Sequence, residues 1–332
     1  MKLMKVLTCL LAAGAFSVLS AQESDLGTTL NAIMQPKNSK NAGGVRLVQP
    51  PAVAKGVLRF VLKDEIHDAT TKDFKVLLIM TPQDLADAQR AYAEGNLNSA
   101  KRQLAAVRTK YAAFAGLPDS PAVKAALMEL KCLARLQDWS GLAKAVEAFP
   151  YPRFQDAADR AVLEAARLLS TVSDDPGTAA ARQKEIEAFM ADSAKMKLIH
   201  STEYGWLKYA LGRAQASGSP EGAQASLAVD SFCEAAMCYR GGEMELAEDA
   251  MKRAFHLLWN MPGVKTYGTT AKKMDEKKWN TAPAEFRDAV ALANLLTTVV
   301  APDIKDDAVR QAAGYFVNTL EGKKPAAPAA EK

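Results

Sequence analysis

The chain of 332 residues is poor in histidine and cysteine, with three and four residues, the side chains that most zinc sites need. It has three histidines, and none stands at zinc-ligand spacing with a cysteine, a carboxylate or a second histidine. It lacks a G-x-S-x-G nucleophile elbow. Gly263 and Gly268 are spaced as in a phosphate-binding loop, but Thr269-Thr270 follow where Lys-Ser/Thr is required. The sequence therefore predicts no metal ion, no cofactor and no catalytic residue.

Glycine and proline are also scarce, with 19 and 15 residues, whereas alanine is abundant, and this composition favours helices over strands. The apolar share of 49% is enough for a sizeable core. The formal net charge is only +4, and Lys2 and Lys5 in the N-terminal segment contribute two of these charges. A chain so close to neutral gives no electrostatic reason to expect nucleic acid or an anionic membrane as a partner.

Residues 1–21 have the pattern of an export signal. Lys2 and Lys5 form a charged start, residues 6–18 form an apolar run, and small residues at Ser20 and Ala21 suit cleavage. The run is too short to span a bilayer comfortably, so an uncleaved anchor is the less favoured alternative, and no later stretch is long and apolar enough. We expect an exported protein, periplasmic or secreted, without a transmembrane segment after the signal peptide.

Three cysteines follow the signal peptide, an odd number for an oxidising compartment. Cys233 and Cys238 are five residues apart on one predicted helix, about 140° apart around its axis, so they cannot bridge each other. A disulfide from Cys132 to either of them stays open. The alternative is that all three are buried thiols that act as small apolar residues.

The rest of the chain divides into four segments. Residues 22–44 are polar and predict a flexible leader, and residues 322–332 predict a disordered tail. Residues 45–80 predict a small β segment of three strands, although 74–80 also fits a short buried helix. Residues 81–321 predict a helical domain: a first helix opens at Thr81-Pro82, and further helices are expected near 96–114, 121–137, 139–148, 154–172, 178–192, 201–217, 222–240, 243–259, 282–299 and 304–319.

One spacing occurs twice in this helical domain. It is small residue-x3-Tyr-x2-Gly-x4-Ala, and its two copies are Ala88, Tyr92, Gly95 and Ala100, then Ala235, Tyr239, Gly242 and Ala247. The glycine offers a positive φ that closes the first helix, and the alanines let two helices pack closely. A weaker third copy covers 123–149, with Gln137 where the glycine would stand. The alternative is an ordinary antiparallel helix pair with an Ala-Gly interface.

These residues resemble the tetratricopeptide repeat, in which helix A and helix B of each unit carry this signature. The resemblance implies a mainly α fold, an irregular solenoid of antiparallel helix pairs, because the two good copies are not separated by a whole number of repeats. Exported bacterial proteins of this type often carry a small β segment ahead of the repeats. The family's concave A-helix surface binds partners, and the resemblance places on it Gln89, Tyr92, Lys131, Arg135, Tyr239 and Arg240. The alternative is that the tyrosines close the helix-pair core and the charged groups are solvated.

The sequence thus predicts an exported, non-catalytic scaffold or adaptor that binds a protein or peptide segment in the bacterial cell envelope. One alternative is an all-helical enzyme or ligand-binding protein acting on cell-envelope polymers, whose carboxylates the fold would have to bring together. The other is a structural envelope component that assembles with copies of itself, so a homo-oligomer stays open.

Overall fold

The structure is a computed structural model, and it describes residues 27–48, 57–62, 65–70, 72–117, 119–150, 156–171, 176–218, 220, 222–239, 243–270 and 274–321. The predicted export signal and the predicted tail lie outside the described residues. The chain divides into two compact units, residues 1–160 and 161–332. It is mainly helical, with a small sheet near the N-terminus, as the composition and the strand patterns predict.

Unit 1 begins with an antiparallel sheet of five strands in the order β4-β3-β2-β1-β5. The strands are β1 (Thr29–Pro36), β2 (Gly43–Val48), β3 (Val57–Leu62), β4 (Glu65–Thr70) and β5 (Phe74–Ile79). The three strands expected within 45–80 are therefore present, and Phe74–Ile79 is a strand and not the alternative short helix.

The prediction of a flexible leader over residues 22–44 is wrong for the part that the structure describes, because β1 lies within it. Leu30, Ala32 and Met34 alternate along β1 and are buried, whereas Asn31 between them is exposed. Such alternation is typical of a strand with one face in the core. The polar residues of the outer face gave this segment the composition of a leader.

The edge strands β4 and β5 differ from the centre of the sheet. β4 buries only Ala69, and Arg59 of β3 pairs with its Asp68 at 2.8 Å between Nε and Oδ1. In β5 the register with β1 shifts at a bulge, and consecutive residues Leu77 and Leu78 are exposed by 40% and 46%. Extra residues in a strand turn side chains to the wrong face, which explains the exposed pair.

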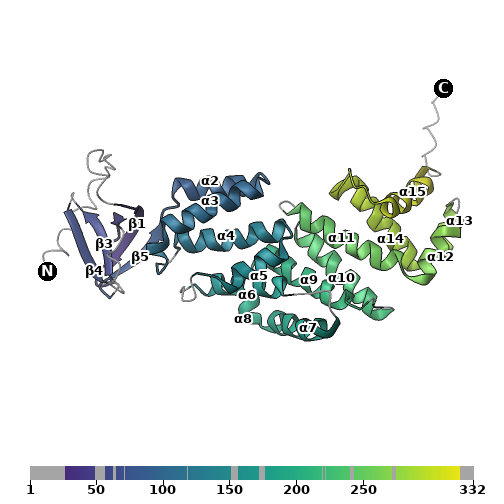
Figure 1. Ribbon diagram of the computed structural model, residues 1–332, viewed down its shortest axis with the longest axis horizontal. Helices are drawn as coiled ribbons and strands as arrows, with labels where there is room; N and C mark the ends of the chain where they lie inside the picture. The colour runs from purple at the N-terminus through teal and green to yellow at the C-terminus, as the bar shows by residue number, and fades with distance from the viewer. Residues whose placement is uncertain are drawn as a thin grey trace, which may run out of the picture. The chain divides into compact units, whose positions relative to one another are not determined.

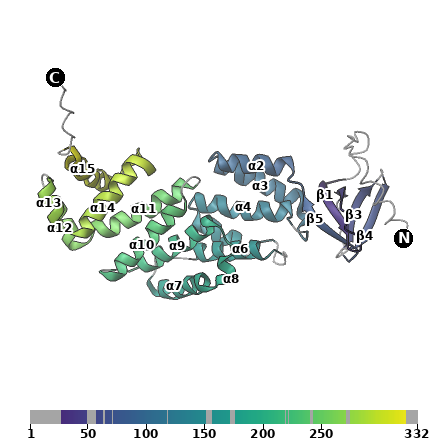
Figure 2. The same ribbon diagram turned by 180° about the vertical axis from the view of Figure 1, so that it is seen from behind.

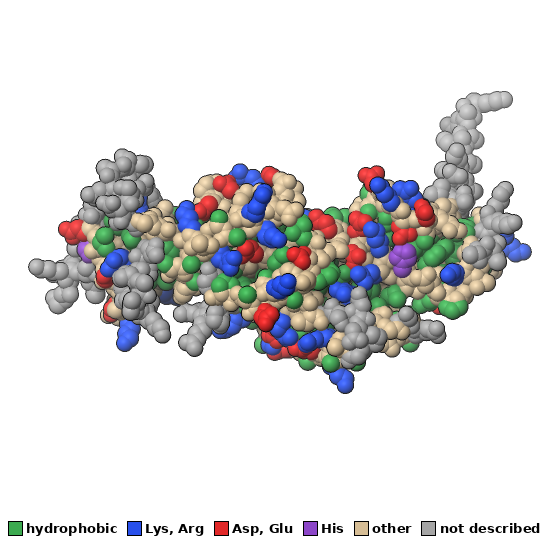
Figure 3. Space-filling model, in the orientation of Figure 1, with side chains coloured by type: hydrophobic (Ala, Val, Ile, Leu, Met, Phe, Trp, Pro, Cys, Tyr) green, Lys and Arg blue, Asp and Glu red, His purple; other side chains and the backbone are tan. Residues whose placement is uncertain are grey.

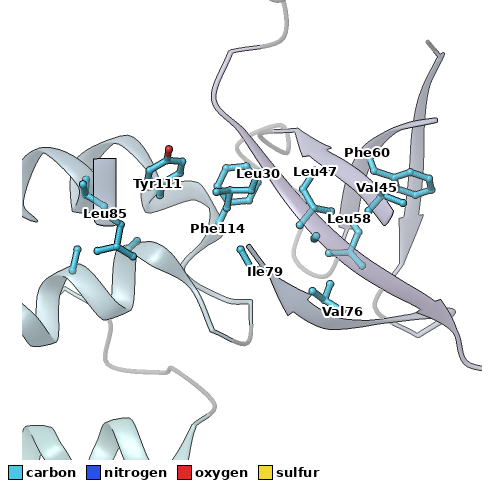
Figure 4. Packing of buried hydrophobic residues seen from close by; sticks show 14 of the residues in the cluster. Leu30, Val45, Leu47, Leu58, Phe60, Val76, Ile79, Leu85, Tyr111 and Phe114 are labelled. Atoms are coloured by element: carbon cyan, nitrogen blue, oxygen red, sulfur yellow. The ribbon is translucent and has the colours of Figure 1, made fainter. Parts of the chain in front are cut away.

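A single hydrophobic core joins the sheet to the first helices of unit 1 (Figure 4). It runs from Phe60 and Leu47 on the sheet through Leu30 and Phe114 to Leu85. The helices are α2 (Gln83–Ala93), α3 (Leu97–Lys110), α4 (Pro121–Arg135) and α5 (Trp139–Glu147), with a 3₁₀ turn over Ala112–Phe114. Figures 1 and 2 show α2, α3 and α4 side by side, next to the sheet.

The repeated motif adopts its expected local structure where the structure describes it. Gly95 has a φ of +79° and ends α2, and Ala88 and Ala100 are fully buried between α2 and α3. Gln137, at the corresponding place after α4, also has a positive φ of 54°. Gly242 in the second copy lies outside the described residues, although Ala235 and Ala247 are buried as expected.

Unit 2 is helical throughout its described part. Its helices are the end of α6 (Ala157–Ser170, which starts in unit 1), α7 (Pro176–Ala191), α8 (Ser193–Met196), α9 (Ser201–Ala216), α10 (Ala223–Cys238), α11 (Met244–Trp259), α12 (Pro262–Thr270), α13 (Glu276–Thr281), α14 (Ala284–Leu295) with a π-helical turn over Leu296–Val300, and α15 (Asp307–Glu321). Neighbouring helices in the chain pack on one another, most extensively α9 with α10 and α10 with α11.

Two glycines of α9 allow α10 to approach closely. A Cβ on Gly205 would stand 2.8 Å from Tyr239 Cε1, and one on Gly212 would stand 2.9 Å from Phe232 Cδ1. Both distances are shorter than carbon–carbon contact allows, so these positions exclude any larger side chain. The close approach of α9 and α10 therefore depends on glycine, as that of α2 and α3 depends on alanine.

No disulfide forms within the described part of the chain. Cys132 is a buried thiol in unit 1, and Cys233 and Cys238 are half-buried thiols on α10. Burial raises the pKa of Cys233 to about 11, with Asp230 adding to the shift. The interpretation of these cysteines as packed thiols agrees with this geometry.

Candidate functional site

The structure brings together two of the six predicted site residues, Tyr92 and Arg135. Arg135 is only 6% exposed, and its Nη1 donates a hydrogen bond to the Tyr92 carbonyl oxygen at 2.9 Å. Its guanidinium Cζ lies 4.8 Å from the centroid of the half-buried Tyr92 ring. The pair thus joins α4 to the end of α2, where the Tyr92 carbonyl also accepts a hydrogen bond from the Gly95 backbone N–H at 3.1 Å.

Of the other predicted site residues, Gln89 and Lys131 stand three and four residues from this pair along α2 and α4, and Tyr239 belongs to unit 2. Gln89 and Lys131 are half-buried on α2 and α4, and Arg240 lies outside the described residues. Tyr239 is 2% exposed and packs against Gly205 of α9, and burial raises the pKa of its phenol well above the ordinary value, with Glu243 adding to the shift. A contact between the Tyr239 side chain and a partner stays a prediction. In the structure, the ring is buried between α9 and α10.

A hollow with a volume of about 950 Å³ lies elsewhere in unit 2, between α9 and α11. This volume is in the range of ligand-binding clefts. We name it the α9–α11 groove. Its lining residues are Arg213, Ala216, Ser217, Gly218, Pro220, Gly222, Phe232, Asp249, Lys252, Arg253, His256, Leu257, Asn260, Met261 and Pro262.

Helical spacing explains why α11 contributes most of this lining. Asp249, Lys252, Arg253 and His256 stand at steps of three and four, so they share one face of the helix. Phe232 of α10 is fully buried beneath them. The groove consequently has an apolar floor and charged walls. Figure 3 shows that charged side chains of both signs and hydrophobic side chains are interspersed over α11 on the face drawn.

Positive charge exceeds negative charge in the lining. Arg213, Lys252 and Arg253 are the cations, and Asp249 is the only lining carboxylate in the described part of the chain. Glu248 pairs with Lys252 at 2.5 Å between Oε1 and Nζ, but it does not line the groove. The groove is therefore suited to a ligand that carries negative charge.

Asp249 is held by two neighbours. It accepts hydrogen bonds from the Tyr209 hydroxyl and from Arg253 Nε, the latter at 2.7 Å. Burial raises the pKa of Tyr209, and the Asp249 charge adds to this shift. Burial works to lower the pKa of Arg253, but Tyr209 and Asp249 raise it above its ordinary value. Asp249 is thus an anchored carboxylate and Tyr209 a neutral hydroxyl at neutral pH.

One wall of the groove is tied to α15. His256 Nε2 lies 2.7 Å from Asp306 Oδ2, and the other oxygen of Asp306 accepts hydrogen bonds from the backbone N–H groups of Ala308 and Val309. This contact fixes the His256 ring beside the start of α15.

No protein-family model, no curated protein and no solved structure matches this chain. Among the residues that the structure describes, no three His, Cys, Asp or Glu side chains are grouped so that they could hold a metal ion. In the same residues, no helix has both the length and the apolar character needed to cross a membrane.

Sequence reasoning missed the residues of the α9–α11 groove because it followed the family resemblance to the A helices. A signal was present: the charged run Asp249, Lys252, Arg253 and His256 keeps one face of a helix polar. Such a face usually indicates contact with water, so only the neighbouring α9 shows that it borders a groove. Arg213 gives no sequence signal, because it lies within a run of buried residues on α9.

Proposed function

We propose that this chain is a non-catalytic helical scaffold that binds an extended protein or peptide segment, and that the α9–α11 groove holds that segment. The carrying observation is that cations and apolar side chains line the same groove. An extended segment turns successive side chains in opposite directions. Acidic side chains would then reach Lys252 and Arg253, while apolar ones reach the half-buried Leu257 and Met261.

The charge distribution supports binding over catalysis by paired carboxylates. General acid–base hydrolysis of envelope polymers uses two carboxyl groups on either side of the reacting bond. The described lining of the α9–α11 groove contains one, Asp249, and it is already held by Tyr209 and Arg253. The all-helical enzyme is therefore the weaker candidate.

Export of the chain is part of this proposal. Its support is the sequence pattern of residues 1–21 alone. N-terminal sequencing of the protein purified from its native host tests it: we expect a chain that begins at Ala21 or Gln22. An intact N-terminus at Met1 in the cytosolic fraction would contradict export.

Binding is tested with a synthetic peptide of alternating Glu and Leu residues, measured by isothermal titration calorimetry. Lys252→Glu reverses one wall charge, and we expect it to weaken binding in this groove by about tenfold or more. Lys184→Glu makes the same charge change on an exposed site of α7 and serves as the matched control. Equal binding by Lys252→Glu and the wild type would remove the groove from the proposal.

A second candidate function, self-assembly, is favoured by one observation on the sheet. Ile66, Leu77, Leu78 and Met80 are all exposed, by 53%, 40%, 46% and 38%, and three of them lie on or just after the edge strand β5. Exposed apolar edges favour association. Sedimentation of the wild type and of Leu77→Ser/Leu78→Ser tests it, and a wild type that stays monomeric at high concentration excludes it.

A further inference from the structure

Unit 1 contains a groove of its own, formed by α3, α4 and α5, with a volume of about 510 Å³. We name it the α3–α5 groove. Its apolar floor is formed by Ala126, Leu130 and Leu133 of α4, which are all buried. The remaining lining residues are Lys101, Arg102, Ala105, Arg108, Glu129, Asp138, Gly141, Lys144, Ala145, Ala148, Phe149 and Pro150.

The groove lies on the side of α4 that is turned away from the predicted binding residues. Lys131 and Arg135 are about 140° and 180° around the α4 axis from Ala126, at 100° per residue. α2, which carries Gln89 and Tyr92, contributes nothing to the lining. The α3–α5 groove is therefore a different surface from the one that the repeat resemblance indicates.

Four cations and two carboxylates line this groove, and both carboxylates are already engaged. Glu129 Oε2 pairs with Arg108 Nε at 2.8 Å. Burial raises the pKa of Glu129, and the charges of Arg108 and Lys101 work to lower it. Asp138 caps α5 by accepting a hydrogen bond from the Gly141 backbone N–H at 2.8 Å.

Arg102 and Lys144 lie on opposite walls of the groove, on α3 and α5, and both are exposed. Within the described part of the chain, no acidic side chain forms an ion pair with either of them. They leave two positive charges facing across an apolar floor. Cations in that position complement an acidic ligand whose apolar groups reach the floor.

The two grooves are built in the same way. Each lies between two helices that flank a central one, α3 and α5 around α4 in unit 1, and α9 and α11 around α10 in unit 2. When the turn positions Gln137 and Gly242 are superposed in the sequence, Lys144 falls on Asp249 and Ala148 falls on Arg253, and all four residues line their grooves. The same face of the repeated helix thus borders both grooves.

We propose that the α3–α5 groove is a second binding site for an extended acidic peptide segment, with Arg102 and Lys144 as the charges that recognise it. Acidic side chains of the segment lie between the two cations, and its apolar side chains contact Ala145 and Phe149, which are half-buried beside the floor. The site is independent of the α9–α11 groove, so the chain binds two such segments.

Calorimetric stoichiometry tests the proposal with the peptide of alternating Glu and Leu, and a Lys/Leu peptide is the charge control. The double variant Arg102→Glu/Lys144→Glu changes two exposed side chains, so the fold is expected to survive, and far-ultraviolet circular dichroism checks it. Lys72→Glu/Lys75→Glu makes the same charge change at exposed positions next to and within β5 and is the matched control.

We expect the wild type to bind two Glu/Leu peptides and the double variant to bind one, with the remaining affinity unchanged. Loss of one peptide by Arg102→Glu/Lys144→Glu, together with no loss by Lys252→Glu, would support this site and remove the α9–α11 groove. Two peptides bound by Arg102→Glu/Lys144→Glu would overturn this site and leave the other proposal standing. Equal binding of the Lys/Leu peptide would overturn both assignments, because charge would then play no part.

Discussion

The guanidinium of Arg135 covers the ring of Tyr92 and donates a hydrogen bond to the carbonyl of the same residue, so that one side chain of α4 closes the end of α2. The contact is almost entirely buried on the arginine side. Such a charge-assisted bond is stronger than a neutral one. The Tyr92 carbonyl also accepts a hydrogen bond from the Gly95 backbone N–H at 3.1 Å, so loss of Arg135 removes one of its two donors. Tyr92 and Arg135 therefore contribute to the stability of unit 1.

We predict that Arg135→Ala lowers the free energy of unfolding by about 2–3 kcal/mol, because it removes a buried charged donor and the ring contact. Arg135→Lys keeps the charge but not the planar fork, so it should recover only part of the loss. Urea unfolding measures both. Arg90→Ala, at an exposed position on α2, is the control and should change stability by no more than about 0.5 kcal/mol. If Arg135→Ala loses peptide binding without losing stability, Arg135 has the partner-binding role that the repeat resemblance implies.

The two positive-φ positions after α2 and α4 predict opposite effects of opposite substitutions. Gly95→Ala should destabilise by about 1–2 kcal/mol, from backbone strain alone, because no atom lies within 4 Å of the added Cβ. Gln137→Gly should relieve similar strain, offset in part by the entropy of glycine, and stabilise by up to about 1 kcal/mol. Thermal and urea unfolding of both variants decide it. If both variants destabilise, contacts of the Gln137 side chain outweigh its backbone strain.

Gly205→Ala should destabilise unit 2 by about 1–3 kcal/mol, since the new methyl group meets the Tyr239 ring and pushes α9 from α10. Gly314→Ala is the matched control on α15. There the added Cβ meets nothing within 4 Å and the helix gains a better helix former, so stability should rise by about 0.5–1 kcal/mol. The midpoints of urea unfolding should therefore move in opposite directions. A neutral Gly205→Ala would mean that the α9–α10 contact adjusts without cost.

Asp159 predicts an unusual pH dependence. Burial raises its pKa from 3.8 to about 6, and Asp156 adds to the shift. Between these values the folded chain keeps a proton that the unfolded chain has lost, so this group's contribution to stability falls as pH rises. Asp159→Asn cannot ionise, so its unfolding free energy should fall less than that of the wild type between pH 4 and pH 6.

Asp306 supplies the opposite case. Burial works to raise its pKa, but the backbone N–H of Val309 and the His256 ring lower it overall. Its stabilising contribution is present above the pKa of the unfolded carboxyl and is lost as pH falls. Urea unfolding of Asp306→Asn at pH values below 4 should therefore lose the acid-side decline that Asp159→Asn keeps. Identical pH profiles for the two variants would contradict both assignments.

Local patterns in the sequence predict most of the helices and their ends. Gly95 and Gln137 take the positive φ that the repeat spacing requires, and Ala88 and Ala100 are buried as the motif predicts. These features depend on neighbours in the chain, so periodicity and turn chemistry are sufficient to find them.

Other features depend on neighbours that are distant in the sequence. β1 was missed because only two of its four buried residues, Leu30 and Met34, are large and apolar, and the sheet that supplies their partners forms across several turns. Gly205 and Gly212 give no signal in the sequence, because the side chains that need their small size, Tyr239 and Phe232, come from the next helix. The grooves were missed for the same reason. Arg102 and Lys144 are solvated cations on their own helices, and only the packing of α3 and α5 around α4 places them in one groove.

The continuous core between the sheet and α2–α4 covers the apolar surface at the N-terminal side of the helices. A stack of helix pairs exposes apolar surface at its first unit and needs a terminal cap. Here Leu30, Met34 and Ile79 of the sheet belong to the same core as Leu85 and Leu104 of the first helix pair. The sheet therefore covers the apolar surface of the first helix pair, and a fragment that begins at the first helix would expose that surface to water.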